Sequence, residues 1–467
     1  MENETRQTKL HHSLITVIAL VAFIFPCVVL WGVDPQIPLL LGCAVGCLVA
    51  KAIGYRWEEI SNGIISGIHN ALEALLILLL IGSLVGVWIS CGTVPTIIYY
   101  GLKIISARYF LPAAFIVCVL ISLAIGSWGT IGTIGLGFMG IGMALELPAG
   151  LVAGAVLSGA YVGEVISPLS DATNLVAAVV SRDVFKLARS MAKVVVPVVV
   201  VTVAAFYLLG LPYASAGSDA VEKSIEPLLE ALQGMFVISP AALLPLVAVL
   251  AAVLLRLPAI PAMFIGSVAG ILQGVLLQHQ PLPALLQSCF SGFVSETGNA
   301  SLDTLLTAGG LDSMMYSVSM IMIAMGFGGM MQATGQMDAL VRPLMRHVKS
   351  KTGLVVLTTI TCVGVNGLLP DQYLALSLPG QMYQPEYERR GIDPVLLGNV
   401  LSAGGATTSC MIPWNTCGTY AAGILGVTAL AYGKYCLLGF LMPLGMIVYA
   451  AIAGIREKRR AKKEQTA

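Results

Sequence analysis

Long apolar stretches with few charges alternate with short polar segments along most of the chain. Four clear examples run from Leu14 to Trp31, Val194 to Leu211, Ala241 to Leu255 and Cys436 to Ala453. Each approaches the roughly 20 residues that a membrane-spanning helix needs. The pattern predicts an all-α polytopic membrane protein with about 10–12 transmembrane helices. Two amphipathic segments, Trp57 to Asn70 and Leu285 to Leu306, are expected to lie along the membrane interface.

Composition supports this prediction and excludes a soluble protein. Hydrophobic residues make up 57% of the chain and charged residues only 10%, with a mean hydropathy of +0.89, whereas soluble domains carry about 25% charged residues. The ten cysteines lie almost all in apolar stretches, where they behave as small hydrophobic residues, so no disulfide framework is predicted. The net charge of +1 and the scarcity of basic patches outside the tail argue against nucleic acid as a partner.

Charge is distributed unevenly between the ends and the middle of the chain. Residues 1–12 form a short polar tail, and residues 455–467 form a strongly basic one. Because lysine and arginine mark the cytoplasmic side of a membrane, both termini are expected in the cytoplasm. The connector 212–240 carries Asp219, Glu222, Glu226 and Glu230 but a single lysine, Lys223, and is expected to be external.

Termini on one side and a connector on the other require an odd number of crossings in each half, so similar halves must be inverted. The predicted repeats cover residues 13–211 and 241–454. Gly67 matches Gly310 with an offset of 310 − 67 = 243, and Pro168 matches Pro413 with an offset of 413 − 168 = 245. Weak internal symmetry of this kind is typical of transporters built from two inverted repeats with re-entrant or discontinuous helices.

The segment from Gly159 to Asn174 places two acids and a proline in apolar sequence. A carboxylate at membrane depth costs about 2.5–3.5 kcal/mol on insertion scales and therefore marks an ion or substrate path. Pro168 interrupts the helical hydrogen bonds and frees backbone carbonyls. A sodium ion takes its oxygen ligands from such groups. The predicted ion ligands are Asp171, Ser170, Thr173, Asn174, Ser167 and Glu164, with Na⁺ at Asp171 and Glu164 as the second choice.

The second half is expected to present an opposing pocket without a carboxylate. Its predicted members are Asn415, Thr416, Ser409, Thr408, Thr419 and Trp414. Polar residues elsewhere at membrane depth complete the set of candidates. Ser127, Thr130 and Thr133 are expected to line a hairpin, and Asp371 and Glu73 are candidate proton or ion relays.

Five segments together resemble the NhaC family of sodium-coupled secondary transporters. They read GTVPTIIYYG, GSWGTIGTIG, GAYVGEVISPLSDATNL, DQYLALSLPG and IPWNTCGTY, in this order between residues 77 and 427. The resemblance implies an ion-transporter fold in the inner membrane of a prokaryote. It also implies sodium/proton exchange in some members, malate/lactate exchange in others and amino-acid uptake in still others. The chain departs from the family where Glu164 and Val165 replace the usual Asp-Lys and where Ser402 and Ala403 replace Glu-Asp.

The interpretation that follows is a Na⁺/H⁺ antiporter without cofactor, in which Na⁺ and H⁺ are the coupling ions. The alternative is a Na⁺- or H⁺-coupled transporter of a small organic acid or an amino acid. A channel and an intramembrane aspartyl protease that uses Asp171 and Asp371 are more distant alternatives. The expected partners are membrane lipid and a small ion or organic solute, and a homodimer stays open.

Overall fold

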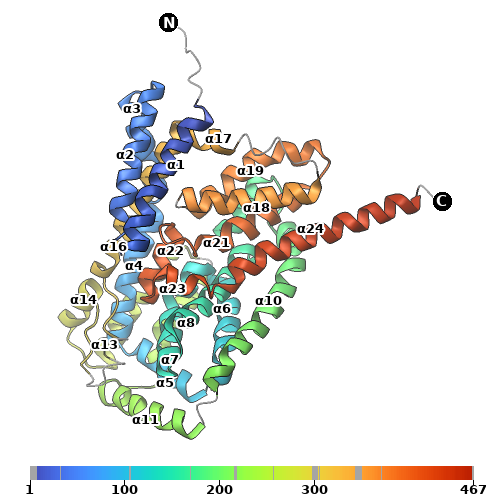
Figure 1. Cartoon of the computed structure of the whole chain (residues 1–467). Coiled ribbons are helices and arrows are strands. Elements are labelled where there is room, and N and C mark those ends of the chain that lie inside the picture. Colours follow the sequence, from blue (N-terminus) through green and yellow to red (C-terminus); the bar gives the residue numbers. More distant parts are fainter. Residues whose placement is uncertain are drawn as a thin grey trace.

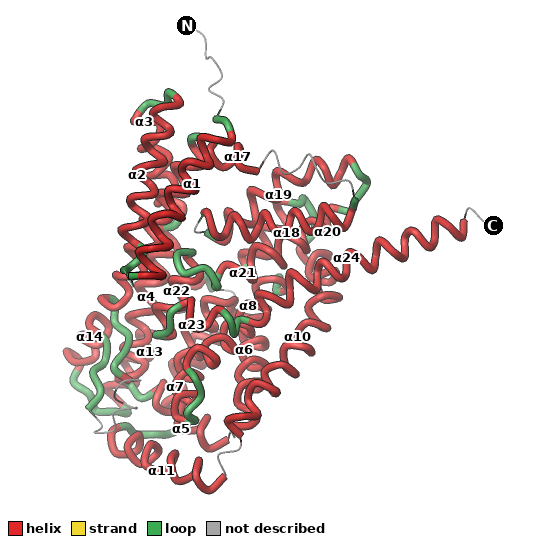
Figure 2. The backbone as a smooth tube through the Cα atoms, viewed as in Figure 1, coloured by secondary structure: helices red, strands yellow, loops and turns green. Residues whose placement is uncertain are grey.

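The structure is a computed structural model of the chain. It describes residues 8–31, 33–104, 107–168, 170–214, 218–255, 257–296, 303, 306–341, 350–369 and 371–464, although some side chains inside these ranges, those of Glu73 and Asp171 among them, lie outside the description. Within these ranges all regular structure is helical, apart from one isolated antiparallel bridge between Phe293 and Ala308. The protein is therefore an all-α polytopic membrane protein (Figures 1 and 2).

The described residues contain six helices that are long and apolar enough to cross a membrane, or up to eight if each of two bent helix pairs forms one span. Three shorter apolar helices accompany them. The first half consists of α1 (Leu10–Ile24), η1 (Phe25–Leu30), α2 (Gln36–Ile53), α3 (Trp57–Asn70), α4 (Leu72–Ser90), α5 (Thr93–Ile104), α6 (Ala107–Thr130), η2 (Ile131–Gly135), α7 (Leu136–Ala144), α8 (Ala149–Ile166), α9 (Asp171–Val179) and α10 (Val184–Ala214).

The connector forms α11 (Ser218–Met235), and the second half follows it. That half consists of η3 (Pro240–Leu243), α12 (Leu244–Leu254), α13 (Ala259–Leu276), α14 (Leu282–Ser291), η4 (Asp312–Met314), α16 (Met315–Ala333), α17 (Gln336–Val341), α18 (Lys351–Leu368), α19 (Gln372–Arg389), α20 (Pro394–Leu401), η6 (Ser402–Ala406), α21 (Thr407–Ser409), α22 (Thr416–Leu425), α23 (Ala429–Gly433) and α24 (Leu437–Glu464).

The two halves are inverted repeats, and each half packs one of its segments against a helix of the other half. Helix α3 of the first half packs along α16 of the second half, as Figure 1 shows at the upper left. The approach is so close that a β-carbon at Gly67 would collide with the Met325 carbonyl. Small residues permit this contact between helix backbones.

The reciprocal contact forms on the other half. The Gly310 N–H, after α14, donates a hydrogen bond of 2.7 Å to the Gly82 carbonyl in α4. Gly82 answers to Met325 with an offset of 325 − 82 = 243, the same offset that relates Gly67 to Gly310. Each half therefore places one segment on the equivalent helix of its counterpart.

Buried amides fasten these exchanged segments. Gln336 at the start of α17 donates to the Gly46 carbonyl in α2 at 3.2 Å and accepts from the Thr16 hydroxyl in α1 at 2.6 Å. In the other half Gln273 of α13 donates to the Cys91 carbonyl at the end of α4 at 3.0 Å. These buried amides thus make hydrogen bonds to neighbouring helices, as buried polar groups normally do.

One predicted amphipathic segment forms a single helix and the other is helical over its first residues, while the membrane position predicted for both stays a prediction. Helix α3 has the predicted bounds, Trp57–Asn70. The segment predicted from Leu285 to Leu306 instead forms α14, which ends at Ser291 because Gly292 adopts a positive φ of 79°. Phe293 then pairs with Ala308 in an isolated bridge, and Asp303 and Leu306 between them are again helical.

Candidate ion site where broken helices cross

Glu164 lies in the last turn of α8 and is only 8% exposed. Its Oε1 atom accepts hydrogen bonds from the Ser127 backbone N–H at 3.0 Å and from the Ser127 hydroxyl at 2.6 Å. Its Oε2 atom accepts from the Ser170 hydroxyl at 2.8 Å. Both oxygens thus have hydrogen-bond donors, an arrangement that suits an ionised carboxylate. We call Glu164, Ser127 and Ser170 with their backbone the first crossing.

A break in α6 makes this arrangement possible. Gly126 has φ 71° and ψ −179°, a conformation open essentially only to glycine, and it turns the Ser127 N–H toward Glu164. Helix α8 lies close beside α6, because β-carbons at Gly159 and Gly163 would collide with carbonyls of α6. Gly159 and Gly163 therefore allow the short distance between α6 and α8, and the break at Gly126 supplies the Ser127 N–H that binds Glu164.

The other predicted ion ligands lie around the first crossing and satisfy backbone carbonyls. Thr173 donates to the Glu164 carbonyl at 2.8 Å, and Ser167 donates to the Leu123 carbonyl at 2.6 Å. Asn174 donates to the Pro168 carbonyl at 2.8 Å. These contacts fix the broken backbone between α8 and α9. Glu164 and Ser170 of the predicted set contact each other through their side chains.

The structure describes the side chains of three further candidates, Ser127, Thr130 and Thr133, and only the backbones of two others, Asp171 and Glu73. The hydroxyls of Thr130 and Thr133 bond to carbonyls four residues earlier, each at 2.7 Å, so they satisfy their own helix. Ser127 is the hairpin residue that reaches the carboxylate. The backbones of Asp171 and Glu73 belong to α9 and α4, but their side chains lie outside the described residues, so the predictions made for them stay predictions.

A second crossing forms in the other half from neutral groups. Asn366 in α18 donates to the Gly405 carbonyl at 2.6 Å and to the Thr408 hydroxyl at 3.0 Å. Asn415, which caps α22, donates to the Asn366 side-chain oxygen at 3.2 Å. Ser409 donates to the Gln372 side-chain oxygen at 2.9 Å. We call Asn366, Gln372, Thr408, Ser409 and Asn415 the second crossing.

The two crossings occupy equivalent positions in the repeats. Ser409 answers to Glu164 and Gln372 to Ser127, since 409 − 164 = 372 − 127 = 245. In the first half Ser127 bonds to Glu164, and in the second half Ser409 bonds to Gln372. The Thr419 hydroxyl also donates to the Pro413 carbonyl at 3.1 Å, as Asn174 does to Pro168. Equivalent contacts thus hold both broken helices, with charge in one and none in the other.

The remaining predicted residues of the second half are buried or capping groups. Asp371 accepts the Leu374 N–H at 2.9 Å and caps α19. Trp414 donates its indole N–H to the Gly367 carbonyl at 2.7 Å. Thr416 is buried in the first turn of α22. These residues therefore shape the second crossing without adding a charge to its hydrogen bonds.

Tyr161 connects the two crossings. It lies one turn before Glu164 on α8, is 1% exposed, and has Cys417 and Glu164 among its neighbours. Its hydroxyl makes no hydrogen bond of ordinary geometry to a described group, and the polar group beside it is the Cys417 thiol. The Cys417 thiol, from the second half, contacts the Gln372 side-chain oxygen at 3.1 Å. A thiol is a weak hydrogen-bond partner for a buried hydroxyl, so Tyr161 is a candidate contact for a transported species.

Sequence reasoning missed Asn366, Gln372 and Tyr161. Isolated amides and a tyrosine give little signal in apolar sequence, because they occur in ordinary helix packing as well. The offset of 245 residues would have found Gln372, which is the counterpart of Ser127. The sequence contained that signal in the match of Pro168 to Pro413.

The described residues contain no group of three or more histidine, cysteine, aspartate or glutamate side chains placed to hold a metal ion. Among the described side chains, the first crossing offers a cation the Glu164 carboxylate with hydroxyl and carbonyl oxygens. Hard cations such as Na⁺ accept such ligands, whereas transition metals favour imidazole and thiolate.

Comparison with known proteins gives consistent matches over almost the whole chain. A family model described as the Na⁺/H⁺ antiporter family matches residues 8–184 and 159–455. The Na(+)/H(+) antiporter NhaC of Alkalihalophilus pseudofirmus is 32% identical over 455 residues, which cover 97% of this chain and 98% of that protein.

Two further relatives are equally similar and carry different names. The Malate-2H(+)/Na(+)-lactate antiporter of Bacillus subtilis is 33% identical over 447 residues, or 96% of this chain and 95% of that protein. The Arginine/ornithine antiporter ArcD of Halobacterium salinarum is 32% identical over 440 residues, or 93% of this chain and 90% of that protein. Overall identity therefore does not distinguish among the three names.

Proposed function

The chain belongs to the Na⁺/H⁺ antiporter family, and from this premise we propose that it exchanges Na⁺ for H⁺ at the first crossing. The observation that carries the proposal is the buried carboxylate of Glu164 with a hydroxyl on each of its oxygens. The proposed activity is transport without covalent chemistry, and its coupling ions are Na⁺ and H⁺.

The geometry supports a competition between the two ions. The hydroxyls of Ser127 and Ser170 now donate to the carboxylate, but each can turn its hydrogen away and offer a lone pair to a cation. The Ser127 N–H cannot do so and holds Oε1 in place. A proton on Glu164 removes the negative charge that attracts the cation. The two ions therefore exclude each other at one carboxylate.

Asp171, the first choice from the sequence, is a further proposed ligand beside Glu164, because it opens α9 directly after Ser170. If its side chain completes the sodium site, Asp171→Asn weakens the apparent affinity for Na⁺ while the protein still inserts into the membrane. Sodium-dependent transport of wild-type affinity in this variant would overturn the assignment of Asp171 and leave that of Glu164 intact. Asp183→Asn, the same change at an exposed carboxylate that accepts the Lys186 N–H outside the site, is the matched control.

The test of the function uses purified protein in proteoliposomes with an imposed sodium gradient and a pH-sensitive dye inside. An exchange of Na⁺ for H⁺ changes the internal pH in the absence of any organic solute. If the internal pH responds only after malate, lactate, arginine or ornithine is added, the protein transports an organic solute and the proposal is wrong. A protein-free liposome with the same gradient measures the leak.

We also propose an inner-membrane location with both termini in the cytoplasm. Basic residues follow the last span, and acidic residues occupy the connector that includes α11. A reporter fused after residue 467 that is active only in the cytoplasm is expected to be active, and the same reporter inserted in the connector is expected to be inactive. The reverse pattern would overturn the orientation.

A further inference from the structure

We propose that Trp128 and Tyr420 form a gate between the first crossing and a cavity on the other side of the pair. This inference rests on the proposed function, since a gate matters only if an ion reaches Glu164. It adds a route of access and two residues that control it.

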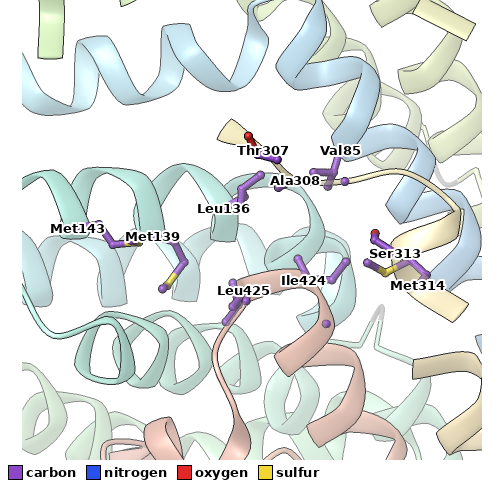
Figure 3. Close-up of a pocket in the computed structure, with 13 residues that line it drawn as sticks. Val85, Leu136, Met139, Met143, Thr307, Ala308, Ser313, Met314, Ile424 and Leu425 are labelled. Carbon is purple, nitrogen blue, oxygen red and sulfur yellow. The ribbon is translucent and has the colours of Figure 1, made fainter. Parts of the chain in front are cut away.

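The cavity has a volume of about 250 Å³ and lies between the two halves. Figure 3 shows Leu136 and Met139 on the side of α7, Ile424 and Leu425 at the end of α22, and Val85 on α4. Sulfur and hydrocarbon groups dominate this lining, which offers little to retain an ion. We therefore assign it as a route of access rather than a binding site.

The two segments pass from the crossings to this cavity in the same order. In the first half, Ser127 contacts Glu164, Trp128 follows, and Leu136 lines the cavity. In the second half, Cys417 contacts Gln372 of the second crossing. Tyr420 lies one turn later on the same helix.

Ile424, a further turn along α22, lines the cavity. Both segments therefore have an aromatic residue between the buried polar groups and the open space.

Trp128 and Tyr420 contact each other and thereby fill the space between the two segments. Their rings stack with centroids 4.2 Å apart and planes 12° apart. The Tyr420 hydroxyl donates to the Trp128 carbonyl at 2.6 Å. Tyr420 is fully buried, and a β-carbon at Gly132 would press against its hydroxyl. The pair is thus held by a stack, a hydrogen bond and a close backbone contact.

The backbone links the gate to the carboxylate. Ser127 gives its N–H to Glu164, and the next residue, Trp128, gives its carbonyl to Tyr420. Gly126, just before them, has a backbone conformation that other residues rarely adopt. A cation or proton that loosens the bonds between Glu164 and Ser127 therefore acts on the peptide that holds Tyr420. The same short segment, Ser127 and Trp128, thus contacts both the Glu164 carboxylate and the gate residue Tyr420.

The chain contains a reporter for this gate. Cys417 lies one turn from Tyr420 on the side of the crossings and is 2% exposed. The experiment uses the full-length protein in liposomes with Cys417 as its sole cysteine, and it measures the rate at which a small cationic methanethiosulfonate reagent modifies this thiol. Tyr420→Ala is expected to raise the rate at least about tenfold, because it removes the barrier. Adding Leu425→Trp, which fills the cavity, is expected to restore the slow rate.

Two controls keep the outcome decisive. Tyr432 bonds to the Cys410 and Gly418 carbonyls of the same region, whereas the ring stacked on Trp128 is that of Tyr420. A rise with Tyr432→Ala equal to that with Tyr420→Ala, or a rise that survives Leu425→Trp, would overturn the gate. If Tyr420→Ala does not fold, Tyr420→Phe removes only the hydrogen bond and is expected to raise the rate about threefold; an unchanged rate would contradict the proposal.

The labelling rate reports access whether or not sodium is transported, so it separates the two proposals. Cavity-dependent labelling without sodium-driven proton movement supports the gate and rejects the exchange. Sodium-driven proton movement with labelling that ignores the cavity rejects the gate and leaves the exchange. A change in rate on adding Na⁺ that Glu164→Gln abolishes supports the link between them, and a change that persists in this variant contradicts that link.

Discussion

The first and second crossings have equivalent positions and different chemistry. Glu164 with Ser127 holds one broken helix, and the neutral pair of Ser409 with Gln372 holds the other. The second crossing shows that the side-chain contact between these two positions can be made by neutral groups. A carboxylate is therefore not required for this contact in the first crossing, and its cost at membrane depth points to a role in transport.

The breaks themselves also differ. Gly126 answers to Asp371, since 371 − 126 = 245. In the first half the break depends on a glycine with positive φ, whereas in the second half Asp371 has φ −140° and its carboxylate caps α19. A side-chain cap fixes a helix start, and a glycine leaves the backbone freer to turn. The comparison thus assigns both charge and conformational freedom to the first crossing.

The largest expected effect tests the charge. Glu164→Gln is expected to lower the rate of sodium-driven proton movement by at least about 100-fold, or about 2.7 kcal/mol, which lies within the usual cost of removing one partner of a buried charged contact. Asp371→Asn keeps a residue that caps α19 and is expected to stay within about threefold of wild type. Dye-monitored transport in proteoliposomes measures both. Equal losses in the two variants would end the distinction between the crossings.

The next effect tests the break. Gly126→Ala forces a side chain into an unfavourable backbone conformation and is expected to destabilise the protein by about 1–3 kcal/mol and to slow transport. Gly367→Ala, in α18, has open space at the β-carbon and is expected to be neutral or stabilising by up to about 1 kcal/mol. Thermal unfolding in detergent compares the two. A harmless Gly126→Ala would show that the break is not strained.

A smaller effect concerns the hydroxyl between the crossings. Tyr161→Phe removes a buried hydroxyl whose polar neighbour is a weakly bonding thiol, so it is expected to leave the stability of the fold unchanged or to raise it by up to about 1 kcal/mol. If the hydroxyl contacts the transported ion, the same change weakens the apparent sodium affinity by about three- to tenfold. Tyr420→Phe is the contrasting control, because it loses a real hydrogen bond. Unchanged sodium affinity in Tyr161→Phe would exclude the hydroxyl from the ion path.

The smallest effect lies outside both crossings. Hydrogen bonds from Arg389, together with Arg390, hold the pKa of Glu386 at about 2, below its ordinary value. A carboxyl with a lowered pKa stabilises the folded state above its unfolded pKa of about 4.3, and this stability is lost as the pH falls toward 2. Glu386→Gln should therefore lower the thermal midpoint by about 1 °C or less at pH 7, and by still less below pH 4.

Transport by the Glu386→Gln variant should equal that of wild type. A clear loss of sodium-driven proton movement would mean that charge outside the crossings takes part in the exchange. That result would weaken the comparison between the two crossings.

The sequence predicted the fold class and the symmetry well because these follow from hydropathy and from glycine positions. Gly67 and Gly310 were matched by sequence alone, and they make reciprocal close contacts in the structure. The predicted group around Glu164 was only partly recovered, because which hydroxyl contacts the acid depends on the direction of the chain after Gly126. The pocket predicted for the second half lacked Asn366, because the role of a buried amide depends on neighbours far away in the sequence.

The exchange of segments between the halves has a consequence for synthesis of the chain. Gly67 contacts Met325, which the ribosome adds 325 − 67 = 258 residues later. At about 5–20 residues per second, α3 waits on the order of 10–50 s for its partner helix. Until then the glycine-rich face of α3 must be covered by lipid or by an insertion factor. The first half cannot complete its packing alone, so the nascent protein commits to its native arrangement only after most of its length has been made.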